Sequence, residues 1–322
     1  MALAHLVIYG ICNALLLLAV LPLQAAPQSD QTTFTLPVRV DEVSVVFSAS
    51  DFEGLPINDL RLSDMTLQDD GKKQTKIMKF EHHAELPLRA GILVDVSGSM
   101  ESNSPFTQLI TRLFAERILR SDSDQAFIMQ FTSMQRMVQD WTNSAEELRQ
   151  GSQPPRKSMG IATAIYDSIY IAVRDQIAKQ PERTSGKANA ILLFSDGVDD
   201  ASHARLQDVM NICQQTNTRI YVFYYGSKSR FGDGQKNLRD LAAGAGGRVF
   251  YNQDVADALS NLRIIENDLR NSYLIAYRPS HLKDDGKFHA IRLTSPTRGG
   301  VIVTRSGYYA PGGQPLNISR HR

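Results

Sequence analysis

Cysteine is scarce in this sequence. Its 322 residues include only two, Cys12 and Cys213, which excludes a disulfide scaffold and a cysteine-rich zinc or iron–sulfur site. A single thiol on an expected helix is usually a small buried apolar group, so we assign Cys213 no chemical role. An excess of charge of one sign is also missing, because 35 Lys and Arg face 34 Asp and Glu and leave a net charge of +1. Nucleic-acid-binding domains normally carry a clear basic excess, so we expect no nucleic-acid partner.

The length and the apolar content are those of a globular protein. Apolar residues make up 42% of the chain and charged residues 21%, which argues against disorder and against a many-pass membrane protein. Since domains usually have about 100–200 residues, the chain is long enough for two.

Charged side chains are absent from residues 1–26. The apolar run at residues 14–21 is followed by Pro22, Ala25 and Ala26, and a short apolar run that ends in small residues is typical of a secretory signal peptide. We therefore predict a secreted, periplasmic or cell-envelope protein that is not inserted in the membrane once the signal is cleaved. Residues 3–23 are also long enough to cross a bilayer, so an uncleaved N-terminal anchor is the alternative.

Strand-like patterns occur in two separate segments, residues 27–87 and 272–310. Residues 34–47 alternate apolar and polar side chains, and Asp69-Asp70-Gly71 is a hairpin signal. Each segment is thin for a hydrophobic core of its own. We therefore expect the two to pair into one small β-sandwich, with two independent β appendages as the alternative. Residues 311–322 are expected to form a flexible tail.

Residues 88–271 alternate strand and helix patterns. Residues 90–94 form a continuous apolar run, as in a buried parallel strand, and residues 106–119 carry apolar side chains at helical spacing. The alternation predicts a doubly wound, Rossmann-like α/β domain, whose mostly parallel sheet has helices on both faces. Residues 133–142 are expected to add one antiparallel strand. The further strands are expected at residues 126–131, 190–194, 219–225 and 248–251, and the further helices at 164–178, 203–214, 237–243 and 255–271.

Polar side chains with oxygen atoms follow the first apolar strand of this domain. Asp95, Ser97 and Ser99 are spaced two residues apart on a short loop that leads into a helix. Ligands in open α/β sheets bind outside the carboxyl ends of the strands. One carboxylate and two hydroxyls directed at a single point suit a hard cation such as Mg²⁺. The same residue types also occur in ordinary turns, so this loop alone is not decisive.

Two further loops offer matching groups. Thr163 lies at the start of an expected helix, where the commoner role of a threonine is the N-cap. Asp196 follows a second apolar strand and precedes Asp199 and Asp200, where the simple alternative is a polar turn. The joint occurrence of all three loops indicates a metal site. We expect Asp199 and Asp200 to lie around this site rather than to bind the ion.

These residues resemble the metal-ion-dependent adhesion site of the von Willebrand factor type A (VWA) domain. That site has the pattern D-x-S-x-S, a threonine from a second loop and an aspartate from a third. The resemblance covers about residues 88–270 and places all five ligands here, on Asp95, Ser97, Ser99, Thr163 and Asp196. The flanking segments, which include LQDDGKKQTKIMKF and YLIAYRP, are similar to the exported bacterial "VWFA-related" proteins described from Acidobacteria.

The resemblance implies a protein-binding module rather than an enzyme. Two carboxylates and three hydroxyls leave Mg²⁺, or Mn²⁺, with an open coordination position. A partner protein would fill that position with an Asp or Glu carboxylate. In relatives, conformational switching moves the last helix, here about residues 255–271. The sequence indicates neither the partner nor the oligomeric state.

Two other functions stay open. In the first, the metal only stiffens the domain and the protein is an envelope scaffold. The second is a metal-dependent hydrolase, which the sequence disfavours because it has no HExxH, G-x-S-x-G or GxxxxGK[ST] motif.

Overall fold

The structure is a computed structural model that describes residues 42–155, 160, 162–180, 186–226, 233–251, 254–280 and 285–310. The predicted signal peptide, the predicted strand up to residue 41 and the predicted tail over residues 311–322 lie outside the described residues. No described helix combines the length and the apolar character needed to cross a bilayer.

A six-stranded sheet, in the order β10-β9-β8-β5-β6-β7, is the centre of the α/β domain. Neighbouring strands are parallel except β7, which pairs antiparallel to β6. This arrangement confirms both the mostly parallel sheet and the single antiparallel strand expected from the sequence. The strands are β5 (Leu88–Asp95), β6 (Gln125–Phe131), β7 (Gln135–Thr142), β8 (Ala188–Ser195), β9 (Thr218–Tyr224) and β10 (Arg248–Phe250).

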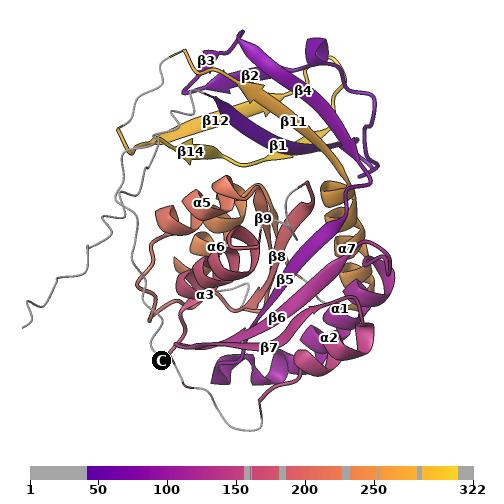
Figure 1. The fold of residues 1–322 in the computed structure, drawn as a ribbon, viewed down its shortest axis with the longest axis vertical. Coiled ribbons are helices and arrows are strands. Elements are labelled where there is room, and N and C mark those ends of the chain that lie inside the picture. The colour runs from indigo at the N-terminus through magenta and orange to yellow at the C-terminus, as the bar shows by residue number, and fades with distance from the viewer. Residues whose placement is uncertain are drawn as a thin grey trace, which may run out of the picture. The chain divides into compact units, whose positions relative to one another are not determined.

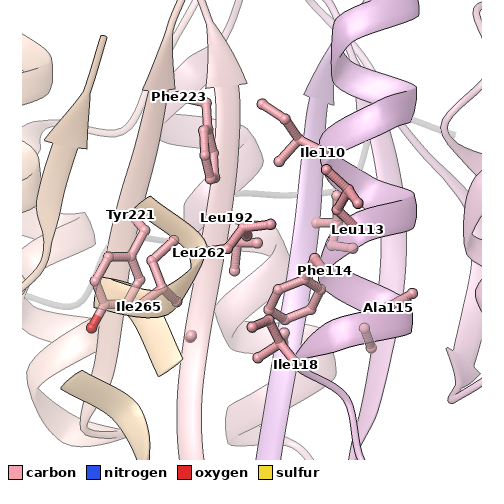
Figure 2. Close-up of a cluster of buried hydrophobic side chains, with 14 of the residues drawn as sticks. Ile110, Leu113, Phe114, Ala115, Ile118, Leu192, Tyr221, Phe223, Leu262 and Ile265 are labelled. Carbon is pink, nitrogen blue, oxygen red and sulfur yellow. The ribbon is translucent and has the colours of Figure 1, made fainter. Parts of the chain in front are cut away.

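Helices cover both faces of this sheet (Figure 1). One face packs against α1 (Ser104–Arg117), α2 (Ala145–Gly151) and α7 (Val255–Arg270). The other packs against α3 (Ile165–Ala172), its π-helical continuation η3 (Val173–Ala178), α5 (Leu206–Gln215) and α6 (Asp233–Gly244). Figure 2 shows part of the first cluster, in which apolar side chains from α1 and α7 lie beside side chains from β8 and β9.

Close packing explains one glycine in the central strand. The apolar side chains of β5 alternate between the two clusters, and Gly91 lies between Ile92 and Ala90, which belong to the α1 cluster. A Cβ atom on Gly91 would lie 2.4 Å from Cζ of Phe127 and 2.8 Å from Cδ1 of Ile191. The absent side chain therefore makes room for the side chains of the two neighbouring strands.

The N-terminal and C-terminal β segments share one β-sandwich, as expected. Its first sheet has the order β13-β1-β11-β4, and its second has the order β14-β12-β2-β3. Phe47, Tyr273 and Tyr277 are fully buried in the common core. The strands are β1 (Val43–Ser50), β2 (Thr66–Asp69), β3 (Lys72–Lys73), β4 (Ile77–Ala84), β11 (Asn271–Tyr277), β12 (Phe288–Thr294), β13 (Val301–Thr304) and β14 (Gly307–Tyr309).

A buried ion pair lies where the chain passes between the sandwich and the α/β domain. β4 leads into β5 and α7 leads into β11, and the N–H of Glu85 donates to the carbonyl of Arg270 at 2.8 Å. The guanidinium of Arg270 is 2.6 Å from the carboxylate of Asp124, and the side chains are 3% and 0% exposed. Asp124 also accepts the N–H of Leu88 at 2.8 Å. One carboxylate thus connects the first residue of β5 to the last residue of α7.

Candidate metal-binding site

Asp95 is the last residue of β5, at the carboxyl end of the parallel sheet. Its side chain is only 2% exposed. The N–H of Ser97 donates to Oδ1 at 3.0 Å, and the hydroxyl of Ser195 donates to Oδ2 at 2.8 Å. Ser195 ends the adjacent strand β8, so the pairing of the two strands orients the carboxylate.

The surroundings of Asp95 disfavour its charged form. Burial raises the pKa of Asp95, the bonds from Ser97 and Ser195 offset part of that rise, and the nearby negative charge of Asp196 raises the pKa further. Every one of these hydrogen bonds comes from a neutral donor. A cation bound beside Asp95 would reverse the balance, because an opposite charge favours the carboxylate.

Ser97 and Ser99 lie on the loop that follows, where β5 gives way to the 3₁₀ turn η2 (Gly98–Asn103). Ser97 is buried and Ser99 is exposed, and their Oγ atoms are 3.3 Å apart. Neighbouring oxygens around Mg²⁺ are about 3.0 Å apart when the bonds are about 2.1 Å long and the geometry is octahedral. The two hydroxyls are therefore almost at the spacing that a shared ion needs.

Thr163 lies on the loop before α3 and is buried. Ala164 is the N-cap of α3 and receives no side-chain cap bond, so Thr163 does not have the capping role that its position allowed. Instead, the carboxylate of Asp200 accepts the N–H of Thr163 at 2.6 Å, and the carbonyl of Thr163 accepts the N–H of Asp200 at 3.0 Å. The Thr163 loop is thus bound to the loop that follows β8.

Asp196 starts the loop after β8 and is half-buried. Its Oδ1 accepts the N–H of Val198 at 3.2 Å, while the Ser195 hydroxyl that holds Asp95 accepts the N–H of Gly197 at 3.1 Å. The structure therefore joins Asp95, Ser97 and Ser99 directly by hydrogen bonds. Asp196 follows Ser195, whose hydroxyl donates to Asp95. Thr163 is bonded to Asp200, which lies on the same loop as Asp196.

The model of the von Willebrand factor type A domain matches residues 91–263 of this chain. The chain belongs to the VWA domain family. The match begins within β5 and ends within α7, so it coincides with the α/β domain and leaves out the sandwich. VWA domains are generally protein-interaction modules, and their adhesion site binds a divalent metal ion.

Several solved structures are distantly similar. BatB from Bacteroides thetaiotaomicron has 14% identity and a TM-score of 0.44, over 55% of this chain and 97% of that one. The von Willebrand factor type A protein from Catenulispora acidiphila has 14% identity and a TM-score of 0.45, over 74% and 73%. Proximal thread matrix protein 1 from the mussel byssus, described with a zinc-occupied adhesion site, has 12% identity and a TM-score of 0.44, over 58% and 48%. No curated protein matches this chain.

The residues at the strand ends of this VWA domain fit a divalent ion. The five candidate ligands offer only carboxylate and hydroxyl oxygens, which hard cations prefer. The buried Asp95 has only neutral donors around it, and the hydroxyls of Ser97 and Ser99 are close together. This donor set distinguishes neither Mg²⁺ from Mn²⁺ nor either of them from Zn²⁺ by its chemistry alone.

Three residues that support the loops of the VWA domain have clear roles. Asp200 and Asp199 accept the N–H groups of Thr163 and Ile165, at 2.6 and 3.3 Å. Both side chains thus hold the backbone around the start of α3. Ser195, which orients Asp95, was not among the predicted site residues, although a hydroxyl that ends an apolar strand just before Asp196 was a usable signal.

A cavity of about 240 Å³ opens beside the Asp95 loop of the VWA domain. Asp95, Ser97 and Gly98 line it together with Ser152 and Pro154. Among the described residues that line this cavity, none is His, Cys or Lys. The described lining of this space mixes carboxylate and hydroxyl groups with apolar side chains.

Proposed function

We propose that this protein is an exported, metal-dependent protein-binding module. Asp95, Ser97, Ser99, Thr163 and Asp196 would hold Mg²⁺ or Mn²⁺, and the carboxylate of an Asp or Glu from a partner protein would complete the coordination. The observation that carries this proposal is the pair of hydroxyls 3.3 Å apart beside a buried carboxylate.

The charge of the loops supports an acidic partner. Asp95 and Asp196 together balance a divalent ion, and the remaining three candidate ligands are neutral. The carboxylates of Asp199 and Asp200 accept backbone N–H groups. The five proposed ligands thus include no third carboxylate, which leaves a coordination position for a carboxylate from a partner.

The cavity next to Asp95 supports recognition of a side chain. Its volume of about 240 Å³ is enough for one acidic side chain with some ordered water. Ser104, Ser152 and the two prolines Pro154 and Pro155 also line it, so a partner segment would contact hydroxyl and apolar groups there. Location outside the cytoplasm rests on the signal-like residues 1–26, and the narrower kinship rests on the similarity to the exported "VWFA-related" proteins.

A selection with displayed peptides tests this function. Random peptides are selected on the chain in Mg²⁺ and eluted with EDTA. We expect the enriched peptides to share one Asp or Glu, and to lose binding when that residue becomes Asn or Gln. They should also fail to bind Asp95→Asn but still bind Asp240→Asn, which changes an exposed carboxylate that is paired with Lys236.

The envelope scaffold is the second candidate, and the burial of Asp95 favours it, because an ion bound at a buried carboxylate also stabilises the fold. It predicts that Mg²⁺ raises the melting temperature while the selection returns no metal-dependent peptide. Peptides that bind equally well in EDTA, or that contain no acidic residue, would contradict the proposed adhesion site.

A further inference from the structure

A second cluster of possible metal ligands lies in the β-sandwich, outside the matched VWA domain. Asp69 ends β2, Asp70 follows it, and His289 lies on β12, the strand that pairs with β2. Each residue offers one ligand atom, and these atoms all lie within 4.8 Å of one another. The three side chains line a cavity of about 480 Å³ together with Asp285.

A tight turn places the Asp70 carboxylate beside His289. Asp70 and Gly71 have φ values of 48° and 76°, which is the left-handed backbone of a two-residue hairpin turn. The N–H of Asp70 donates to the carbonyl of Ala290, and Oδ1 of Asp70 accepts the N–H of Ala290, both at 2.9 Å. Oδ2 is left 2.8 Å from Nδ1 of His289.

The Asp69 carboxylate is buried and also held in position. Its Oδ2 accepts the hydroxyl of Tyr277 at 2.7 Å and the hydroxyl of Tyr308 at 3.0 Å. Both donors are neutral. Within the described part of the chain, no Lys, Arg or His side chain comes within ion-pair distance of this carboxylate. A buried carboxylate that lacks a cationic partner suits a metal ligand.

His289 is the residue that points most directly to a ligand. Only 9% of it is exposed, and its ring stacks on that of Tyr308, with centroids 5.2 Å apart. Its Nε2 is buried without a hydrogen-bond partner, and Oδ1 of Asp285 lies 3.5 Å away. Buried polar atoms are normally hydrogen-bonded. An ion bound at Nδ1 would put the ring proton on Nε2, which could then donate it to Asp285.

We propose that Asp69, Asp70 and His289 bind one divalent transition-metal ion, such as Zn²⁺. Nδ1 faces Asp70 and is the ligand atom, so the ring proton resides on Nε2 and is donated to Asp285. Histidine ligands commonly donate their second ring N–H to a carboxylate in this way. A tetrahedral ion with bonds of about 2.1 Å holds its ligand atoms about 3.4 Å apart, so the three side chains would have to adjust on binding it.

The chemistry of this cluster differs from that of the adhesion site. An imidazole nitrogen with two carboxylates favours Zn²⁺, Co²⁺ or Mn²⁺ over Mg²⁺, whereas the adhesion site offers oxygen alone. The ion would connect the β2–β3 turn to β12, which are more than 200 residues apart in the chain. It would therefore join the N-terminal and C-terminal halves of the sandwich.

Zn²⁺ titration by calorimetry tests this site on the full chain. The protein is first stripped with chelator and then held in excess Mg²⁺, so that the adhesion site is occupied. We expect the wild type to bind one equivalent of Zn²⁺. His289→Gln and Asp70→Asn should each weaken binding by roughly 100-fold or more, and Asp285→Asn by about 10–100-fold, the range for a carboxylate that orients a ligand.

Two variants serve as controls. His83→Gln removes another histidine of the same sandwich, one that pairs with Glu81 at 3.0 Å, and should bind Zn²⁺ as the wild type does. Asp95→Asn should also bind Zn²⁺ as the wild type does, because the proposed ion binds in the sandwich and not at the adhesion site. Zn²⁺ binding that is lost in Asp95→Asn but kept in His289→Gln would overturn the proposal.

Asp70→Asn protects the test against misfolding. Asparagine tolerates the left-handed backbone at this position and keeps an oxygen for the N–H of Ala290. If His289→Gln fails to fold, Asp70→Asn and Asp285→Asn decide the result. Equal Zn²⁺ affinity in the wild type and in these two variants would refute the site.

Discussion

Replacing Asp95 with asparagine separates a metal ligand from a structural carboxylate. Asparagine has nearly the same shape, and its Oδ1 can still accept the N–H of Ser97. Its Nδ2 would face the hydroxyl of Ser195, which has acceptor capacity for it. The substitution therefore removes a charge from a residue that is 2% exposed and leaves the local hydrogen bonds possible.

The expected effect changes sign with metal. In EDTA, a neutral amide avoids the desolvation of a buried carboxylate near Asp196, so Asp95→Asn should be more stable than the wild type by on the order of 1 kcal/mol. With the metal ion present at 100 times its Kd, the free energy of unfolding of the wild type should rise by about 2.7 kcal/mol. For a domain of this size, that gain raises the Tm by about 5–10 °C. The variant should gain almost nothing, so the order of the two melting temperatures reverses.

Thermal unfolding followed by calorimetry in EDTA, Mg²⁺ and Mn²⁺ measures both effects. Asp196→Asn should also lose the metal-induced shift, with a smaller gain in EDTA because Asp196 is only half-buried. Asp240→Asn controls for the loss of an exposed negative charge. If Asp95→Asn melts below the wild type in EDTA and both proteins respond equally to metal, Asp95 is structural and the proposed ligand set is wrong.

Three further predictions concern the stability and reactivity of the α/β domain. Arg270→Met leaves the charge of Asp124 buried and should lower the free energy of unfolding by about 3–5 kcal/mol in a urea titration. Arg149→Met removes an exposed pair with Glu146 and should have a much smaller effect; equal losses would contradict this. Burial raises the pKa of Asp124, but its bonds from Arg270 and from two backbone N–H groups outweigh burial and lower it overall. The wild type should therefore lose stability as the pH falls below about 4, and Asp124→Asn should show a flatter dependence. Burial raises the pKa of Cys213 to about 12, so a thiol reagent at pH 8 should label it only on unfolding, and rapid labelling of the native protein would refute its burial.

The order of elements was predictable because hydrophobic spacing changes between strands and helices. Residues 90–94 were expected as a strand, and β5 extends that run to Leu88–Asp95. Spacing did not reveal that the helix expected over residues 164–178 changes to π-helical hydrogen bonding at Val173, because this change shifts the backbone bonds and not the apolar face. It also missed α2, a seven-residue helix whose single fully buried apolar side chain is Leu148.

The parts of the candidate adhesion site that lie close together in sequence were the easiest to predict. Asp95, Ser97 and Ser99 are adjacent in sequence, so their common loop could be read directly. Asp200 holds the Thr163 loop across 37 positions of sequence, and that contact depends on the paths of two loops. The Asp70 and His289 pair is farther apart still, at 219 positions. The hairpin signal predicted its turn but gave no sign of the strand that would pair beside it.

The end of α7 limits how the domain could switch. The prediction from relatives is that the helix at residues 255–271 moves, and the structure fixes its last turn from several sides. The carboxylate of Asp268 accepts the hydroxyl of Ser48 at 2.6 Å and the guanidinium of Arg248 at 2.8 Å, while Arg270 pairs with Asp124. A sliding motion of the whole helix would break all three contacts, and loss of the buried Arg270–Asp124 pair alone would cost about 3–5 kcal/mol.

The first turns of α7 present part of their apolar surface to solvent. Val255 and Leu259 are 46% and 38% exposed, whereas Ala258 is fully buried, and the carboxylate of Asp254 accepts the N–H of Asp257 at 2.9 Å. A movement coupled to the metal site that keeps the contacts of Asp268 and Arg270 would leave the C-terminal end anchored to the sandwich and displace only the N-terminal end. The insertion of the VWA domain between two halves of a sandwich thus fixes the part of the helix that a chain ending after α7 would leave free.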